Sequence, residues 1–378
     1  MSAENPIAPI LQAFVQPWHD ALIDPPAVQE RVLQRLLATY AHTEYGQQRN
    51  AERIGSIAVY RAAFPIMTYA DYEPLLRRVM SGETHALLEA EPLGWAMTRG
   101  TTGDSKYIPM TPRDLDQRHN AARAVIQYVL NTRRYDILTG ANLNLSFPSV
   151  TGRMDVNGRQ IEYGYATGIY VKHVAARTPI PSIPTQQAID DLGGGTSQSA
   201  WDVRFQLAYD SARNQNMTIL GGAAQVALKF ARWLHRTHGA YPKNIWRFGV
   251  LSLGSTPGIN STLRPRLLAL YGAQAGLVEI YGATEGMFGQ QFDDRRYWVP
   301  NYDLYFFEVE TRQGIKMLHE MQPGETGSLI ASTPVLPRYR ILDIVRAFKP
   351  PYFLCIGRDR PWTRSVYWLR RTLEMDFN

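Results

Sequence analysis

The sequence predicts an α/β protein with layers of parallel sheet and helix and a small antiparallel, barrel-like part. In the middle of the chain, apolar strands such as "RFGVLSL" (247–253) and "LVEIYG" (277–282) flank a helix over 259–272. Such alternation is typical of parallel sheets. Towards the C-terminus strand follows strand, over 302–310, 326–332 and 338–348. This change of pattern predicts the antiparallel part.

Composition excludes several classes of protein. The 378 residues are 45% hydrophobic and 20% charged, which is enough for a large core. No apolar run approaches the ~20 residues of a membrane helix, and no basic segment precedes an apolar one at the N-terminus, so we expect neither a membrane span nor a signal peptide. The single cysteine, Cys355, excludes disulfide frameworks and favours a cytoplasmic location. A net charge of +6 is too mild to indicate nucleic-acid binding.

The N-terminal third is predicted to be mostly helical. An amphipathic helix is predicted within 26–63, because apolar residues recur there at helical spacing. The apolar residues at this spacing are Val28, Val32, Leu33, Leu36 and Leu37. A second helix is predicted over 70–83, with Gly82 near its C-terminal end. Thr111 is expected to cap a long helix that continues to about Val129.

The central region is predicted to contain strands over 141–150 and 163–171. Residues 177–199 look like a loop, and its triple glycine is not interpreted as a phosphate site because no lysine or arginine lies near it. Helices are predicted over 200–213 and 223–237.

The segment "MTRGTTGDSK" (97–106) connects two predicted strands, 93–97 and 106–110. Its hydroxyls, glycines and backbone N–H groups could bind a polyphosphate. It lacks the Walker A pattern, and its lysine begins a strand rather than a helix. By itself the segment is equally compatible with a phosphate-binding loop and with a simple hairpin turn.

Other polar groups follow predicted strands. "LSLGSTPG" (251–258) and "EIYGATEG" (279–286) bring hydroxyls and the Glu285 carboxylate to the C-terminal ends of parallel strands, where α/β sheets bind ligands. Asp343 and Arg358 follow in "YRILD" and "GRDR". Together with the glycine-rich loop, these groups are the components of an ATP site with a carboxylate for Mg²⁺.

Three segments carry a family resemblance: "TRGTTGDSKYIP" (98–109), "YGATEG" (281–286) and "YRILD" (339–343). In order and spacing they resemble the nucleotide motifs of adenylate-forming enzymes. Within that superfamily the chain resembles the GH3 acyl-acid amido synthetases over about residues 60–360, with further similarity in "FPIMTYADYEPLLRRVMSGE" and "ILGGAAQVALKFARWL".

The resemblance implies the fold of a large adenylate-forming domain, with a core over 1–345 and a hinge and short C-terminal remnant over 346–378. It implies that a carboxylic acid attacks the α-phosphate of ATP, releasing pyrophosphate, and that an amine or amino acid then takes the acyl group. ATP and Mg²⁺ are the implied cofactors, and a separate lid domain or protein is a possible partner.

The resemblance also implies a role for each motif residue. The residues around the β- and γ-phosphates would be Thr98, Gly100, Thr101, Thr102, Gly103 and Lys106. Glu285 would coordinate Mg²⁺, with Thr284 near the α-phosphate. The residues flanking the adenine would be Tyr281 and Gly282 on one side and Ser255 and Thr256 on the other. Asp343 would bind the ribose hydroxyls, and Arg358 corresponds to the superfamily's hinge arginine.

The sequence departs from the family pattern in three places. Arg99 stands where a small residue is usual, and Leu342 replaces the glycine of Y-R-x-G-D. Only 20 residues follow Arg358, fewer than a mobile C-terminal domain needs. The last segment is expected to be one amphipathic helix that docks on the core or a partner through Trp362, Val366 and Leu369.

Several alternatives stay open at this stage. A catalytically impaired relic or nucleotide-binding module, or an acyl-CoA ligase, would share the same motifs. Asp343 could instead pair with Arg340, and Tyr281 could be a core residue. His235 and His238 look like solvated histidines rather than a metal pair. An acyl pocket lined by Tyr163, Tyr165, Phe205 and Leu220 is expected from position alone.

Overall fold

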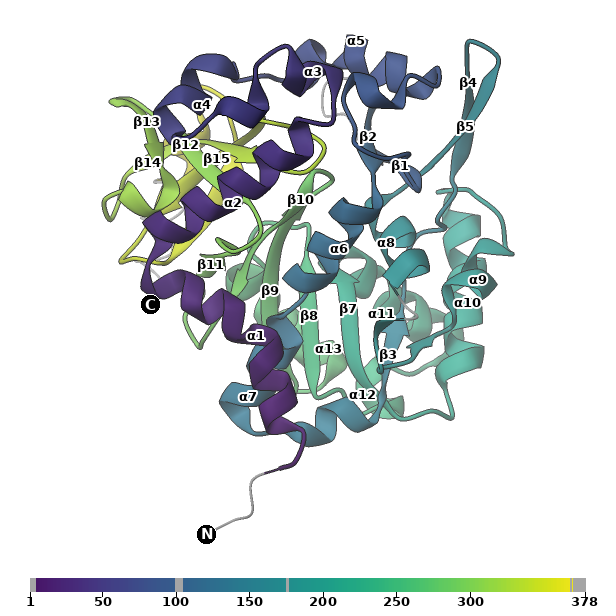
Figure 1. Ribbon diagram of the computed structural model, residues 1–378. Helices are drawn as coiled ribbons and strands as arrows, with labels where there is room; N and C mark the ends of the chain where they lie inside the picture. Colours follow the sequence, from purple (N-terminus) through teal and green to yellow (C-terminus); the bar gives the residue numbers. More distant parts are fainter. Residues whose placement is uncertain (1–4, 99–104, 175–176, 368, 370–378) are drawn as a thin grey trace.

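The computed structural model describes residues 5–98, 105–174, 177–367 and 369. Its strands form a twelve-stranded sheet in the order β13-β12-β14-β15-β16-β11-β10-β9-β8-β7-β3-β6 and a four-stranded sheet in the order β2-β1-β5-β4. Figure 1 shows helices on both sides of the large sheet and the small sheet at its upper edge. The predicted α/β class is confirmed.

The parallel half of the large sheet is covered on both faces. Its strands are β3 (Ala141–Asn144), β6 (Ser182–Ile183), β7 (Met217–Ala223), β8 (Val250–Gly254) and β9 (Gly276–Ala283). On β8, Val250 packs into a cluster with α1 and α7, whereas Leu251 packs into a cluster with α10 and α11. Successive side chains of a strand point to opposite faces, and this strand is buried on both of them.

The antiparallel half continues the same sheet from β10. Its strands are β10 (Gly286–Gln291), β11 (Trp298–Pro300), β12 (Phe306–Thr311), β13 (Gly314–Met317), β14 (Thr326–Ser332), β15 (Tyr339–Ala347) and β16 (Phe353–Arg358). The antiparallel pairing agrees with the sequence. In the described chain these strands share one sheet with the parallel strands, because β10 pairs with β9.

The helices cover the sheet in two groups. The N-terminal helices are α1 (Ala8–Ile23), α2 (Pro25–Tyr40), α3 (Glu44–Gln47), α4 (Ile57–Ala63) and α5 (Tyr69–Met80). The central ones are α6 (Pro112–Ala121), α7 (Ala124–Thr132), α8 (Ala166–Val174), α9 (Gln186–Asp190), α10 (Gln198–Ala212), α11 (Ala224–His238), α12 (Pro242–Ile245) and α13 (Arg264–Tyr271). The five apolar residues predicted for α2 are all buried.

The small sheet carries the glycine-rich segment. The predicted hairpin is formed by β1 (Gly94–Thr98) and β2 (Lys106–Met110), with Thr98 opposite Lys106. The other two strands are β4 (Gly152–Val156) and β5 (Arg159–Gly164), which form a second hairpin. Figure 1 shows this second hairpin projecting from the body of the molecule.

Some predicted elements are wrong in extent or type. Residues 163–171 are not a strand: β5 ends at Gly164 and α8 follows, because Ile169 packs into the cluster between β1, β2 and α6. The predicted helix within 26–63 is divided into α2, α3 and α4, and the helix after Thr111 breaks at residues 122–123. The strand over 141–150 ends at Asn144.

The C-terminal segment does not dock on the core through the expected apolar side chains, and its docking on a partner stays a prediction. Trp362 and Leu369 are 57% and 62% exposed, and Val366 is also exposed, so their apolar side chains do not dock on the described core. The contact with the sheet is polar instead, because Arg364 Nε donates to Thr326 Oγ1 over 3.1 Å.

The start of α8 depends on a glycine. A Cβ on Gly164 would lie 2.1 Å from the carbonyl oxygen of Ser149. We expect Gly164→Ala to lower the free energy of unfolding by about 1–3 kcal/mol or more, because backbone must move to admit the methyl group. Urea unfolding measures the change. Gly55→Ala is the matched control, since no atom lies within 4 Å of its added Cβ, and an equal loss in both variants would contradict the packing argument.

Candidate nucleotide site

The predicted site residues gather where the two halves of the large sheet meet. Ser255 and Thr256 follow the C-terminal end of β8, and Thr284 and Glu285 form the two-residue loop between β9 and β10. Strands β8 and β9 are parallel neighbours, so both segments lie at one edge of the sheet.

The turn after β8 has two unusual features. Ser255 has a φ of 63°, a left-handed conformation that non-glycine residues adopt rarely. The Thr256 hydroxyl is buried and has no hydrogen-bond partner among the described residues. A buried hydroxyl without a partner is costly, so this group is suited to bind a ligand.

Glu285 is a buried carboxylate, with 6% of the residue exposed. Burial raises its pKa, while the positive charges of Lys106 and Arg358 act in the opposite direction. Glu285 forms no ion pair with the described residues. A bound divalent cation would compensate its charge, so the carboxylate fits the predicted Mg²⁺ ligand.

Asp343 on β15 contacts residues of two other strands, β9 and β16. The Tyr281 hydroxyl donates to its Oδ2 over 2.8 Å, and Arg358 Nη1 lies 3.1 Å from its Oδ1. Burial raises the pKa of Asp343, and Arg358 and Tyr281 oppose this. Arg340 pairs with Glu310 instead, so the alternative pairing of Asp343 with Arg340 is wrong.

The residue before Asp343 adopts the backbone that a glycine would favour. Leu342 has a φ of 65°, and the register between β14 and β15 shifts beside it. The Leu342 carbonyl accepts from Asp359 N over 2.8 Å, so the strained residue lies within a bonded hairpin. The turn therefore keeps a left-handed geometry in the absence of glycine, at the cost of backbone strain.

Tyr281 contributes its hydroxyl rather than its ring. The ring stacks on Trp298 with centroids 4.7 Å apart, and only 6% of the residue is exposed. The ring is therefore part of the core, as the alternative interpretation expected, and it leaves little surface for an adenine. The neighbouring Gly282 is exposed, and its role beside the adenine stays a prediction.

The β1–β2 hairpin supplies a lysine to the site. Lys106 N donates to Thr98 Oγ1 over 3.4 Å, and the Lys106 ammonium lies 5.7 Å from the centroid of the Tyr69 ring. The positive charge of Lys106 opposes the rise in the pKa of Glu285 that burial causes, so Lys106 on β2 interacts electrostatically with the β9–β10 loop. Five predicted residues lie outside the described part of the chain: Arg99, Gly100, Thr101, Thr102 and Gly103.

Two polar residues near the site, Arg118 and Glu279, were not predicted from the sequence. Arg118 on α6 donates to the Thr284 carbonyl over 2.6 Å and pairs with Asp114 at 2.7 Å. Glu279 on β9 accepts from Asn260 Nδ2 over 3.0 Å, and burial raises its pKa to about 7. The polar pair four residues apart on a helix was a signal for Arg118, but its contact with Thr284 spans 166 positions.

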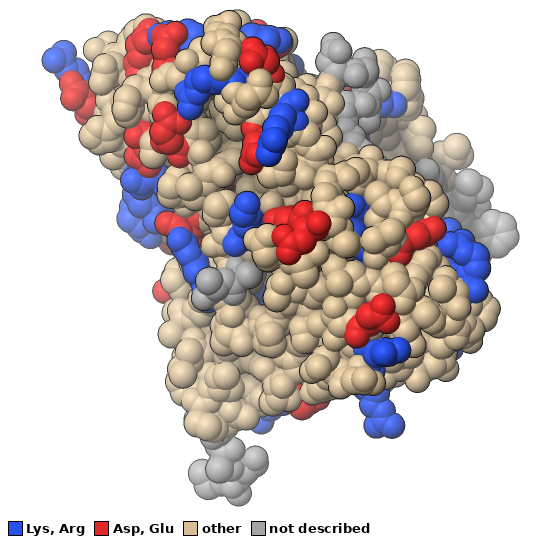
Figure 2. All heavy atoms as spheres, turned by 90° about the vertical axis from the view of Figure 1, so that its right-hand side faces the viewer, with Lys and Arg blue, Asp and Glu red and all other residues tan. Residues whose placement is uncertain are grey.

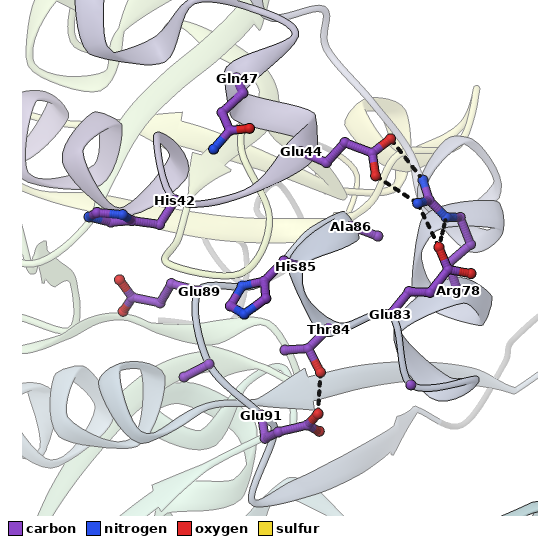
Figure 3. Close-up of a pocket in the computed structure, with 12 residues that line it drawn as sticks. His42, Glu44, Gln47, Arg78, Glu83, Thr84, His85, Ala86, Glu89 and Glu91 are labelled. Carbon is purple, nitrogen blue, oxygen red and sulfur yellow. Dashed lines mark hydrogen bonds and ion pairs between the residues drawn. The ribbon is translucent and has the colours of Figure 1, made fainter.

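Two cavities in the described part of the chain lie away from these groups. One, of about 790 Å³, is lined by residues from α3, α5 and the segment after it (Figure 3). Its carboxylates already have partners, since Glu44 and Glu83 pair with Arg78 and Glu91 accepts from Thr84. The other, of about 1020 Å³, lies beside α1 and α2. Neither cavity contains a predicted site residue.

The remaining expectations concern metal sites, membrane spans, two histidines and the distribution of surface charge. Within the described ranges, no group of three or more His, Cys, Asp or Glu could bind a metal, and no helix is long and apolar enough to cross a membrane. His235 stacks on Tyr241 and His238 on Tyr209. Figure 2 shows acidic and basic side chains interspersed on one face.

Of the residues expected to line an acyl pocket, Phe205 and Leu220 share one apolar cluster, whereas Tyr163 packs against another. Phe205 and Leu220 are each 1% exposed and belong to the core of the parallel half, so they cannot line an open pocket as they stand. Tyr163 contacts Tyr107, and Tyr165 contacts Phe147. Cys355 lies half-buried on β16, beside Asp343.

Replacing Leu342 tests the left-handed backbone. We expect Leu342→Gly to be more stable than Leu342→Ala by about 1 kcal/mol, because both variants lose the side chain but only glycine relieves the positive φ. Urea unfolding of the two variants gives the difference directly. If alanine proves the more stable, as it is at ordinary strand and helix positions, the left-handed assignment is wrong.

Glu279 makes stability depend on pH. Its folded pKa of about 7 exceeds its ordinary 4.5, so the folded state retains a proton that the unfolded state releases, and stability falls as pH rises through this window. Glu279→Gln keeps an oxygen for Asn260 and has no such titration. We expect its stability advantage to be on the order of 3 kcal/mol larger at pH 8 than at pH 4.5. An advantage that does not change with pH would contradict the assignment.

Part of the chain is similar in sequence to known proteins. Residues 16–188 match the GH3 family N-terminal domain. The chain is 29% identical over 97 residues to indole-3-acetic acid-amido synthetase GH3.2 of Arabidopsis thaliana, covering 25% of this chain and 18% of that protein. It is 33% identical over 94 residues to GH3.8 of Oryza sativa subsp. indica, covering 24% and 16%. The matches therefore span less than a fifth of these relatives' length.

Solved structures resemble the chain over a larger share of its length. The AtGH3.15 acyl acid amido synthetase in complex with 2,4-DB superposes with a TM-score of 0.74 at 17% identity, covering 93% of this chain and 71% of that one. An open form of 2-hydroxyisobutyryl-CoA ligase has a TM-score of 0.57 at 14% identity, covering 86% and 73%. The fold is therefore similar to that of these two enzymes. The family match over residues 16–188 and the similarity of fold both relate the chain to the GH3 family.

Proposed function

We propose that the protein is an ATP-dependent ligase that activates a carboxylic acid as an acyl-adenylate and transfers the acyl group to an amine. The observation that carries the proposal is the convergence of Thr256, Glu285 and Asp343 at the junction of the two sheet halves. The names of the relatives, which are amido synthetases for indole-3-acetic acid, support the reaction class.

The reaction consists of two substitutions. A carboxylate oxygen of the acid attacks the α-phosphorus of ATP, and the bond from that phosphorus to the bridging oxygen breaks to release pyrophosphate. An amine nitrogen then attacks the acyl carbonyl, AMP leaves with the bonding electrons, and the nitrogen loses its proton. The protein contributes mainly positioning and charge neutralisation, since neither step requires a covalent enzyme intermediate.

The residues present fit the nucleotide and the metal. Glu285 would bind Mg²⁺, which when bound neutralises phosphate charge. Lys106, with Thr98, would bind the outer phosphates, while Thr284 would lie near the α-phosphate. Asp343 would accept hydrogen bonds from the ribose hydroxyls, in competition with its contact to Arg358. The Thr256 hydroxyl, which lacks a described partner, would bond to the base or sugar.

We also propose a domain boundary later than the one expected from the sequence. Residue 345 lies inside β15, and β15 pairs with β16 up to Arg358. A boundary at 345 would divide a bonded strand, so the proposed adenylation core extends through Arg358. The proposed hinge segment follows it.

The proposal is tested by ATP–pyrophosphate exchange with a panel of aromatic, indolic and aliphatic carboxylic acids. We expect exchange with at least one acid and a loss of at least about 100-fold in Glu285→Gln, since a metal-coordinating charge is removed while the shape is kept. Glu44→Gln, in the cavity of Figure 3, should keep full activity.

Other outcomes separate the alternatives. ATP binding without exchange would favour a nucleotide-binding module, and exchange that survives in Glu285→Gln would contradict the proposed metal ligand. When an acid has been found, comparison of amine and thiol acceptors distinguishes amide formation from an acyl-CoA ligase.

A further inference from the structure

Arg118 lies outside the proposed nucleotide contacts but bonds directly to the loop that carries them. Its Nη2 donates to the Thr284 carbonyl over 2.6 Å, and its Nε donates to Asp114 Oδ2 over 2.7 Å. The arginine and the aspartate are 3% and 0% exposed. A buried cation that bonds to a carbonyl and a carboxylate is shielded from water, so these bonds are stronger than surface ones.

The loop that Arg118 contacts does not have the sequence of a self-sufficient hairpin turn. Ala283 pairs with Gly286, which leaves Thr284 and Glu285 as a two-residue connection. Such connections are usually built from residues with positive φ, typically Asn or Gly. Neither Thr284 nor Glu285 has a positive φ. The turn therefore needs support from outside itself, and Arg118 supplies a bond to its carbonyl.

The positive charge of Arg118 is balanced by a carboxylate on the same helix. Asp114 is its ion-pair partner four residues earlier on α6, and the amide of Asp114 is bonded by the N-cap hydroxyl of Thr111. The cation is thereby prevented from compensating Glu285 fully, which leaves that carboxylate available to a metal. The same helix follows β2 directly, so α6 also connects the loop to the strand that carries Lys106.

We propose that Arg118 is a positioning residue that fixes the Thr284–Glu285 loop in the geometry needed to bind Mg²⁺ with ATP. The inference rests on the proposed function. It assigns to Arg118 no contact with the substrate, since its bonds go to Thr284 and Asp114. A purely structural arginine would stabilise the protein without changing its magnesium dependence.

The test is calorimetric titration of the whole chain with ATP at a series of Mg²⁺ concentrations and in EDTA. We expect Arg118→Met to raise the Mg²⁺ concentration for half-maximal ATP binding by about tenfold or more, as the loss of a charged hydrogen bond implies. Affinity for metal-free ATP should change by less than about twofold. Arg118→Lys retains the charge and a donor and should recover part of the loss.

Arg338→Met is the matched control. Arg338 is also buried and bonds to a carboxylate, Glu308, and to the carbonyls of Arg61 and Phe64, but to none of the site residues. It should lower stability without changing the Mg²⁺ requirement. If Arg118→Met and Arg118→Lys bind ATP with the wild-type Mg²⁺ dependence, the inference is overturned while the proposed function stands. If the folded wild type binds no ATP at any Mg²⁺ concentration, both are overturned.

Discussion

The hydrogen bond from Tyr281 to Asp343 connects the two halves of this molecule at the candidate site. Tyr281 lies on the last parallel strand, whereas Asp343 lies on an antiparallel strand. The tyrosine ring is fixed by stacking on Trp298, so its hydroxyl has a defined position. Arg358 then completes the contacts of the carboxylate from the adjacent strand. A buried carboxylate with partners from both halves constrains how the parallel and antiparallel halves of the sheet can join.

This constraint explains why the site contains strain. The left-handed Leu342 turns the backbone immediately before Asp343, and the left-handed Ser255 does so after β8. Such conformations persist only where the surroundings fix them, and they occur often at ligand sites. Both positions lie next to residues with a proposed contact to the nucleotide. The strain is therefore concentrated next to the Asp343 carboxylate and the Thr256 hydroxyl, whose orientation matters for the proposed contacts with the nucleotide.

Much of the fold could be predicted from local pattern. Strands β8 and β9 were identified because short apolar runs end in glycine and hydroxyl residues, and α2 because its apolar spacing is regular. The error at α8 has a physical reason: "YGYATGIYV" is rich in residues that favour strands, but tertiary packing of Ile169 against the small sheet determines a helix. Likewise the single sheet depends on the β9–β10 pairing, which no local pattern specifies.

The sequence could predict those parts of the candidate site that lie in motifs at or near strands, but not the contacts between them. Glu285 and Asp343 were proposed as site residues from their place in motifs. The contacts of Tyr281 with Asp343 and of Arg118 with Thr284 are long-range, so no local sequence pattern predicts them. The pairing of Asp343 with Arg358 rather than Arg340 likewise follows from strand register, which places residues 343 and 358 opposite each other.

The central claim, that these groups form one nucleotide site, is tested most directly by a crystal structure with Mg²⁺ and a non-hydrolysable ATP analogue. We expect ribose density at Asp343, metal density at Glu285 and phosphates towards Lys106. A nucleotide bound elsewhere, such as in the cavity near His85, with the Asp343 and Glu285 carboxylates uncontacted, would contradict it.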